Sequence, residues 1–158
     1  AFIEIDPEGE LEHKSNATTY KAKLESLDKE LRDSLSSIPK ERRFLVTCEG
    51  AFTYLARDYG MKEAYLWPVN SESQVTPRRM VNLIKIIKEN EIPTIFCEST
   101  VSSEAQMEVA KSSGAVFGGT FYVDSLSDLK GPAPTYIDLL RHNVGLITKG
   151  LSLSNVNK

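Results

Sequence analysis

The stretch Ile95-Phe96-Cys97-Glu98-Ser99-Thr100 joins a short apolar run to a single carboxylate and two hydroxyl residues. Short apolar runs of this kind are typical of buried parallel strands, and the serine and threonine that follow can open a helix. Open α/β folds bind their ligands at the carboxyl ends of their strands. The stretch therefore predicts a buried strand that delivers Glu98 to the ligand-binding edge of a sheet.

Other extended segments and helices alternate with this strand along the chain. The sequence predicts strands at 44–48, 64–67 and 93–97, a fourth at 116–123 that Gly118-Gly119 interrupts, and helices at 51–59, 77–90, 103–113 and from 136 onward. Thr76-Pro77 and the capping box Ser103-x-x-Gln106 mark two helix starts. Such alternation predicts an α/β fold, with a four-stranded mainly parallel sheet, right-handed crossovers and helices on both faces.

A long amphipathic helix precedes this α/β region. Its apolar positions are spaced 4-3-4-4, and they are Tyr20, Leu24, Leu27, Leu31 and Leu35. The pattern predicts a helix over 15–37 that ends before Ile38-Pro39, because the residue before a proline disfavours helical geometry. The apolar stripe is one side chain wide, so we expect the helix to lie along another element as a strut.

Composition and charge limit the classes of protein to be considered. The chain has 158 residues, 41% of them apolar and 26% charged, and a net charge of −3, which is globular. No basic tract and no run near the ~18 apolar residues of a spanning helix occurs, so we expect no nucleic-acid partner and no membrane span. The opening AFIEIDPEGE lacks the basic region of a signal peptide, which predicts a cytosolic protein or a fragment.

Two carboxylates occupy equivalent positions. Glu98 and Asp124 each end an apolar run and each precede a serine, so they converge on one edge if their strands are close. A carboxylate pair suits glycosidase chemistry, but no sugar-stacking aromatic residues cluster nearby. Two oxygen ligands suit a divalent metal, although a full site needs four or more. The alternative is that both residues cap the following helices or are ordinary strand-end acids.

Two cysteines also occupy matched positions. Cys48 and Cys97 are each the last residue of a predicted strand, separated by one βαβαβ unit. Neighbouring parallel strands lie ~4.8 Å apart, which is close to the Cα separation of a disulfide. A bridge is predicted if the strands are adjacent and the compartment is oxidising; otherwise both are small buried apolar residues.

The remaining candidates carry little chemistry. His13 and His142 show no metal-binding spacing and are interpreted as surface histidines. No nucleophile motif GxSxG and no phosphate-binding glycine motif is present. Gly118-Gly119 is interpreted as a bulge or a close backbone approach.

Four motifs in order resemble a known family. They are CEGAFxYLARDYG at 48–60, EST at 98–100, YVDSL at 122–126 and GPxPTYxDLL at 131–140. Together they resemble the C-terminal lobe of the metal-binding solute-binding proteins of bacterial ABC importers, which carry manganese, zinc or iron. The details are most similar to the manganese-type members, including the cysteine pair. The resemblance extends over nearly the whole chain.

The resemblance implies a domain organisation and a ligand set. Residues 1–40 correspond to part of the helix that links two lobes, and residues 41–158 to the C-terminal lobe. Glu98 and Asp124 match the two carboxylate ligands of this lobe, and Cys48 and Cys97 match a disulfide. The family's N-terminal lobe, which supplies two histidine ligands, has no counterpart in this sequence.

The implied function is capture of a divalent metal ion, with Mn²⁺ expected first and Zn²⁺ or Fe²⁺ as alternatives. The implied partner is the ABC permease of the same importer. The implied location is the periplasm or the extracellular surface, with a lipid anchor as an option for the full-length protein. The resemblance implies no enzymatic activity. Two alternatives from the residues stay open: a hydrolase or transferase using Glu98 and Asp124 as an acid/base pair, and an adhesin or interaction domain without metal.

The adjacency of Cys97 and Glu98 suggests one further hypothesis. A Cys48–Cys97 bridge would fix the position of Glu98, so its reduction would loosen the metal.

Overall fold

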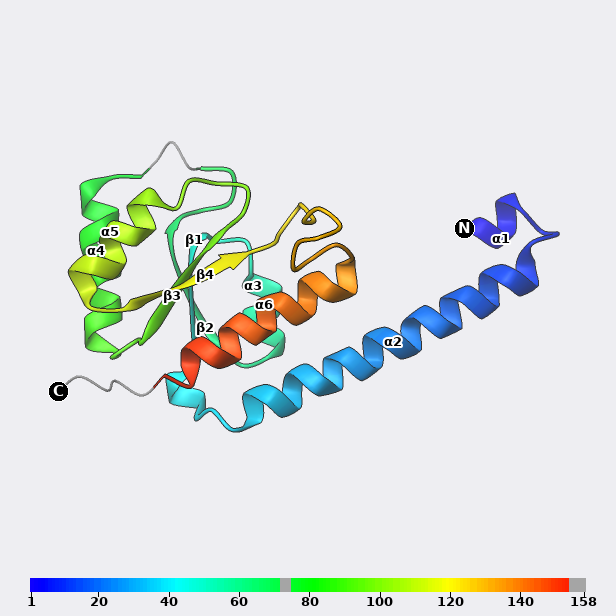
Figure 1. Cartoon of the computed structure of the whole chain (residues 1–158), viewed down its shortest axis with the longest axis horizontal. Coiled ribbons are helices and arrows are strands. Elements are labelled where there is room, and N and C mark those ends of the chain that lie inside the picture. The colour runs from blue at the N-terminus through cyan, green and yellow to red at the C-terminus, as the bar shows by residue number, and fades with distance from the viewer. Residues whose placement is uncertain (72–74, 154–158) are drawn as a thin grey trace.

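The structure is a computed structural model that describes residues 1–71 and 75–153 (Figure 1). The elements are α1 (Phe2–Ile5), α2 (Glu10–Ser36), a 3-10 turn (Lys40–Arg42), β1 (Phe44–Glu49), α3 (Thr53–Asp58), β2 (Lys62–Trp67), α4 (Pro77–Glu89), β3 (Thr94–Glu98), α5 (Glu104–Ser113), β4 (Val116–Phe121) and α6 (Tyr136–Leu151). The predicted alternation of strands and helices is confirmed. No described helix combines the length and the apolarity needed to cross a membrane.

The strands form two parallel pairs. β1 pairs with β2, and β3 pairs with β4. The inner strands β1 and β3 lie side by side, and a disulfide between Cys48 and Cys97 joins their carboxyl ends. Among the described residues, the predicted four parallel strands are therefore present, but they are hydrogen-bonded as two pairs rather than as one continuous ladder.

Helices cover both faces of these strands, as predicted (Figure 1). On one face α4 and α5 pack over a core that contains Val46, Leu66, Leu83, Ile87, Ile95 and Val109. On the other face α3, α6 and the end of α2 pack over Leu45, Phe96, Phe121, Ile147 and Leu151. All five residues of β3 are buried, because this strand lies between two helical layers. Because β3 is buried, the Glu98 side chain at its end is buried as well.

The predicted bulge in β4 is confirmed. The register advances by two residues on β3, from Ile95 to Cys97, and by three on β4, from Phe117 to Thr120. Gly119 has a φ of 128°, which favours glycine. A Cβ on Gly118 would lie 2.3 Å from Cγ2 of Thr94, so the Gly118 backbone also lies close to side chains of β3. A bulge bends its strand, and this one lies just before the segment that leads to Asp124.

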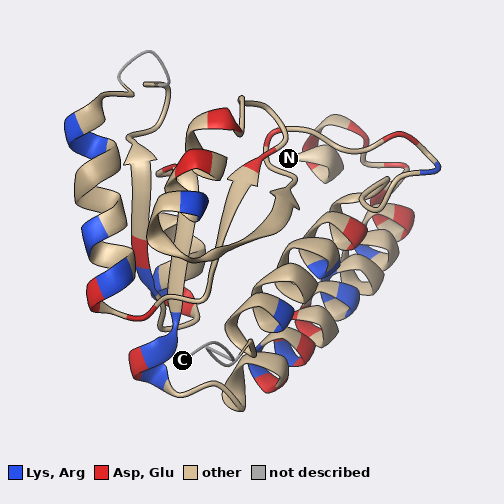
Figure 2. Cartoon of the chain, turned by 60° about the vertical axis from the view of Figure 1, so that its left-hand side comes forward, with Lys and Arg blue, Asp and Glu red and all other residues tan. Residues whose placement is uncertain are grey.

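The long helix α2 starts earlier than predicted and is buried over a shorter length. It begins at Glu10, and only Leu27, Leu31 and Leu35 of its described residues are buried. Leu27 and Leu31 pack against Val144 of α6, whereas Tyr20 is 44% exposed. The rest of α2 extends beyond the body of the molecule, with Lys and Arg interspersed among Asp and Glu (Figures 1 and 2). The strut interpretation holds for its last turns.

The helix start predicted at Ser103 is confirmed, because α5 begins at Glu104 with Ser103 as its N-cap residue, but the predicted capping box is wrong. Ser103 makes no capping hydrogen bond, and Gln106 is fully buried instead of reaching back to the helix start. Its Nε2 donates to the carbonyl oxygen of Phe96 at 2.9 Å. Phe96 has no partner in the β3–β4 register because of the bulge, so its carbonyl oxygen is available to accept the hydrogen bond from Gln106. The cap predicted at Thr76 is confirmed, since Thr76 Oγ1 accepts a hydrogen bond from the Arg79 amide.

Candidate metal centre

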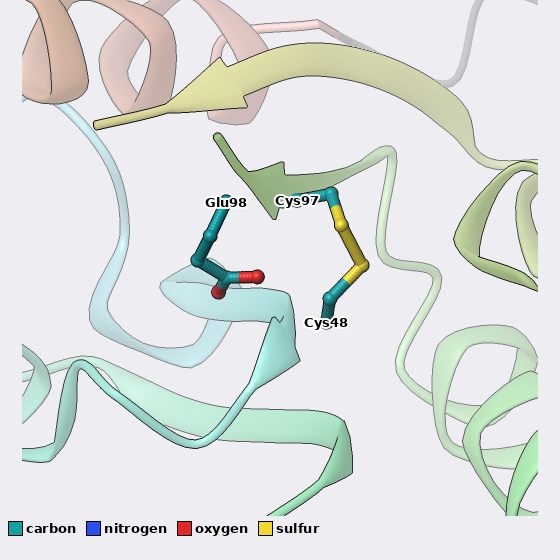
Figure 3. A group of neighbouring side chains, drawn as sticks. All are labelled: Cys48, Cys97 and Glu98. Carbon is teal, nitrogen blue, oxygen red and sulfur yellow. A yellow bond between two sulfur atoms is a disulfide. The ribbon is translucent and has the colours of Figure 1, made fainter. Parts of the chain in front are cut away.

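Glu98 ends β3 as a buried carboxyl group. Only 1% of its surface is exposed. Its side chain points from β3 toward the end of β1, beside the Cys48–Cys97 disulfide (Figure 3). The backbone N–H of Glu49 donates to both of its carboxyl oxygens, at 3.4 and 3.3 Å. The first of the two predicted carboxylates therefore lies at the carboxyl edge of the strands, as the sequence indicated.

The charge of Glu98 is poorly compensated. Burial raises the pKa of this carboxyl to about 7, and the nearby Glu49 carboxylate adds to the rise, while hydrogen bonds from the backbone oppose it. Within residues 1–71 and 75–153, none of the ion pairs involves Glu98. A buried carboxylate without a cationic partner is costly, and a divalent cation would remove that cost.

Asp124 lies in the segment after β4, at the same end of the parallel β3–β4 pair as Glu98. It follows the end of β4 by three residues, is exposed, and has a φ of 53°. Aspartate tolerates this left-handed conformation better than most residues, because its short side chain can bond locally. Asp124 lines an open pocket of about 840 Å³, whose other walls include Phe52, Leu55 and Leu140. Glu98 is not among the residues that line this pocket, whose walls are mostly apolar.

Two serines link the segments that carry the two carboxylates. Ser99 follows Glu98 and Ser125 follows Asp124, and their hydroxyl oxygens lie 2.8 Å apart in a hydrogen bond. The amide of Ser99 also donates to the carbonyl oxygen of Phe121 at 2.8 Å. Each carboxylate is thus one residue from a shared hydroxyl bridge. The strand ends converge, as they must if both residues contribute to one site.

The structure contains the predicted disulfide. The Cα atoms of Cys48 and Cys97 lie 4.9 Å apart. Among the described residues, the one group of three potential metal-ligating side chains is Cys48, Cys97 and Glu98, whose ligand atoms lie within 4.8 Å of one another. The two sulfurs are bonded to each other, and metals bind the thiolate form of cysteine, so this group is not a ligand triad. The disulfide instead fixes the backbone immediately before Glu98.

Both histidines lie at the surface, as predicted, and both make contacts there. His13 and His142 are each partly exposed. Nε2 of His13 lies 2.9 Å from Asp6, and Nε2 of His142 lies 3.0 Å from the carbonyl oxygen of Thr120. Both therefore make local contacts within the described part of the chain.

Sequence reasoning missed two residues of this region. Glu49 ends β1, and its carboxylate accepts a hydrogen bond from the Asn70 amide while its own amide contacts Glu98. The sequence could have indicated Glu49, because it is a third carboxylate at the end of a strand. Asn143 is buried on α6 and hydrogen-bonds to the backbone of Tyr122. Its signal was a polar residue on the apolar face of the last predicted helix.

The sequence of this chain matches the model of a known protein family. The family model described as "ZnuA: Zinc-uptake complex component A periplasmic" matches residues 1–150. The chain belongs to this ZnuA family. The resemblance to metal-binding solute-binding proteins of ABC importers is thereby confirmed, since relatives are named as substrate-binding components of metal transporters.

Relatives within the ZnuA family are named for different metals. The iron-binding protein YfeA of Yersinia pestis is 51% identical over 150 residues, which are 95% of this chain and 48% of YfeA. A manganese-bound periplasmic metal binding protein from Candidatus Liberibacter asiaticus superposes with a TM-score of 0.87 at 39% identity, covering 95% of this chain and 55% of that one. For the periplasmic zinc binding protein TroA of Treponema pallidum, the TM-score is 0.88 at 28% identity, with 96% and 57% covered.

This chain spans about half the length of the curated relatives that it matches. The solved ZnuA-family structures confirm the fold class, a mixed α/β arrangement of parallel strands and helices. The names of the relatives include iron, manganese and zinc, so family membership alone does not select the ion.

Proposed function

We propose that this chain supplies two carboxylate ligands, Glu98 and Asp124, to the substrate site of a divalent-metal ABC importer. The observation that carries the proposal is the state of Glu98: it is buried, has a raised pKa and has no cationic partner among the described residues. The hydroxyl bridge between Ser99 and Ser125 supports a site shared with Asp124. The metal ion is the transported substrate, and the chemistry is capture rather than catalysis.

The site as proposed is incomplete within this chain. Two carboxylates leave most of the coordination shell of a divalent ion to water. Because the matched relatives are about twice as long, we propose that a second lobe supplies the remaining ligands, two histidines, across the edge where Glu98 and Asp124 lie. In this proposal residues 1–40 belong to the helix linking the lobes and residues 41–158 form the C-terminal lobe.

The proposed ion is Mn²⁺, with Zn²⁺ and Fe²⁺ as the competing ions. Carboxylate oxygens suit Mn²⁺, while imidazole also suits zinc and iron. Zinc binds mixed nitrogen and oxygen sites more strongly by intrinsic affinity, so geometry and metal supply must favour manganese if it is the natural substrate. A relative named as a manganese-binding lipoprotein, at 33% identity, supports this choice.

The proposed partner is the permease of the same importer, to which the full-length protein delivers the ion. Relatives are named as periplasmic proteins or as substrate-binding lipoproteins of metal ABC transporters. We therefore place the full-length protein in the periplasm or at the extracellular surface. An oxidising compartment of this kind also suits the disulfide.

Calorimetric titration with Mn²⁺ tests the ligand assignment. This chain is expected to bind weakly, and Glu98→Gln or Asp124→Asn to weaken binding further by at least about tenfold. Glu108→Gln is the matched control, because Glu108 is an exposed acid on α5. Tight 1:1 binding by this chain would contradict the half-site. Binding that neither variant changes would contradict the choice of ligands.

A further inference from the structure

Asn143 holds the backbone of Tyr122 through both ends of its side-chain amide. The Tyr122 N–H donates to Oδ1 of Asn143 at 3.0 Å, and Nδ2 of Asn143 donates to the Tyr122 carbonyl oxygen at 2.8 Å. Asn143 is only 4% exposed, although the hydrogen bonds themselves are partly buried, because Tyr122 is partly exposed. Replacing Asn143 would leave two partly buried backbone groups of Tyr122 without these partners, which costs stability.

The contact between Asn143 and Tyr122 lies between the end of β4 and Asp124. β4 ends at Phe121, so Tyr122 is the first residue after the strand, and Asp124 follows two residues later at a φ of 53°. Asn143 therefore holds the backbone by hydrogen bonds at the point where the pairing of β4 with β3 ends. The neighbouring residue of α6, His142, contacts the carbonyl oxygen of Thr120 at 3.0 Å and packs edge-on against the ring of Tyr122.

We propose that Asn143 is a positioning residue for Asp124. It fixes the segment between β4 and the Asp124 turn, so that the carboxylate is already oriented when the metal ion arrives. This inference rests on the proposed function, since it assigns Asn143 a role only through a ligand. Residues that orient metal ligands from behind commonly contribute substantially to affinity.

The two carboxylates are thus fixed by different means. The disulfide holds the residue before Glu98, and the Asn143 amide holds the residue two positions before Asp124. Asp124 is exposed at a strained φ and has no such covalent constraint on its own segment, so it depends more on the hydrogen bonds behind it.

A double-mutant cycle separates positioning from general stability. Asn143→Ala is expected to lower the Mn²⁺ affinity of this chain by about tenfold, and to have no further effect in the Asp124→Asn background, because Asn143 acts through Asp124. Val144→Ala is the matched control, since Val144 is the next residue on α6 and is also 4% exposed. It is expected to lower stability but leave affinity unchanged.

The outcomes distinguish the two proposals. If Asp124→Asn leaves the affinity unchanged, the proposed function fails at that ligand. If Asp124→Asn weakens Mn²⁺ binding while Asn143→Ala leaves the affinity unchanged, as Val144→Ala does, the positioning role is wrong and the ligand assignment stands. The same conclusion follows if the effects of Asp124→Asn and Asn143→Ala on affinity simply add.

A measurement on the wild-type chain covers the case in which Asn143→Ala does not fold. Hydrogen exchange of the Tyr122 amide is expected to be slow in the metal-free protein and unchanged by Mn²⁺, because the Asn143 bond exists before the metal binds. Fast exchange that becomes slow only with Mn²⁺ would overturn the inference, since the segment would then be ordered by the ion.

Discussion

At the scale of single residues, the carboxyl of Glu98 connects metal binding to stability. Its pKa is raised to about 7 by burial, from an ordinary value of 4.5. The folded protein therefore binds this proton more tightly than the unfolded chain does. By linkage, the group's contribution to stability is fully present below pH 4.5 and is lost as the pH rises to about 7.

We predict that this loss amounts to roughly 3 kcal/mol for the metal-free chain. Glu98→Gln cannot ionise, so its free energy of unfolding should lack this decrease and exceed that of the wild type at pH 8. Urea unfolding of both proteins between pH 5 and pH 8 measures the difference. Parallel pH profiles for the two proteins would show that Glu98 is not the group responsible.

Two glycines give opposite predictions for the same substitution. Gly118→Ala should lower the free energy of unfolding by about 1–3 kcal/mol, because its Cβ would lie 2.3 Å from Thr94 and 2.6 Å from Phe96. Gly145 lies inside α6 and a Cβ there would meet nothing within 4 Å. Gly145→Ala should therefore raise stability by roughly 0.5–1 kcal/mol through helix propensity. Thermal unfolding compares them, and a neutral Gly118→Ala would mean that the bulge is not tightly packed.

At the scale of elements, the disulfide is the covalent link between the two strand pairs. It closes a loop with a sequence separation of 49 between Cys48 and Cys97. In the chain-entropy description, a loop of this length corresponds to about 4 kcal/mol of stabilisation. We predict a loss of that order on reduction with a dithiol, measured by urea unfolding before and after treatment.

Reduction should also affect the metal site. Cys97 immediately precedes Glu98, so freeing it is expected to weaken Mn²⁺ binding by the full-length protein. The control is a titration of the reduced Glu98→Gln protein, in which reduction should have little left to change. If the reduced and oxidised wild-type proteins bind Mn²⁺ with equal affinity, the disulfide does not influence metal binding.

At the scale of the whole molecule, the sequence predicted the parts that depend on local pattern. Apolar runs located the strands, Thr76 located a helix start, and the run before Glu98 predicted that this strand would be buried. These features follow from the chemistry of neighbouring residues along the chain. The resemblance to metal-binding solute-binding proteins, which the family match confirms, rested on motifs of the same local kind.

What the sequence could not predict depends on contacts between distant elements. Gln106 fits a capping box, but its side chain binds Phe96 because the bulge leaves that carbonyl available. Tyr20 fits the apolar stripe of α2, but the described chain places nothing over that part of the helix to bury it. The amide contact of Asn143 with Tyr122 joins residues 21 positions apart and has no local signature of its partner.

We propose that the segments after β3 and β4 together carry one metal site. The most direct test follows the amide resonances of the ¹⁵N-labelled chain while Mn²⁺, which broadens nearby signals, is added. If both segments contribute to one site, the amides of Ser99 and Ser125 broaden first and together, and combining Glu98→Gln with Asp124→Asn removes the effect. Broadening centred on the acidic residues of α2, with Ser99 and Ser125 unaffected, would contradict it.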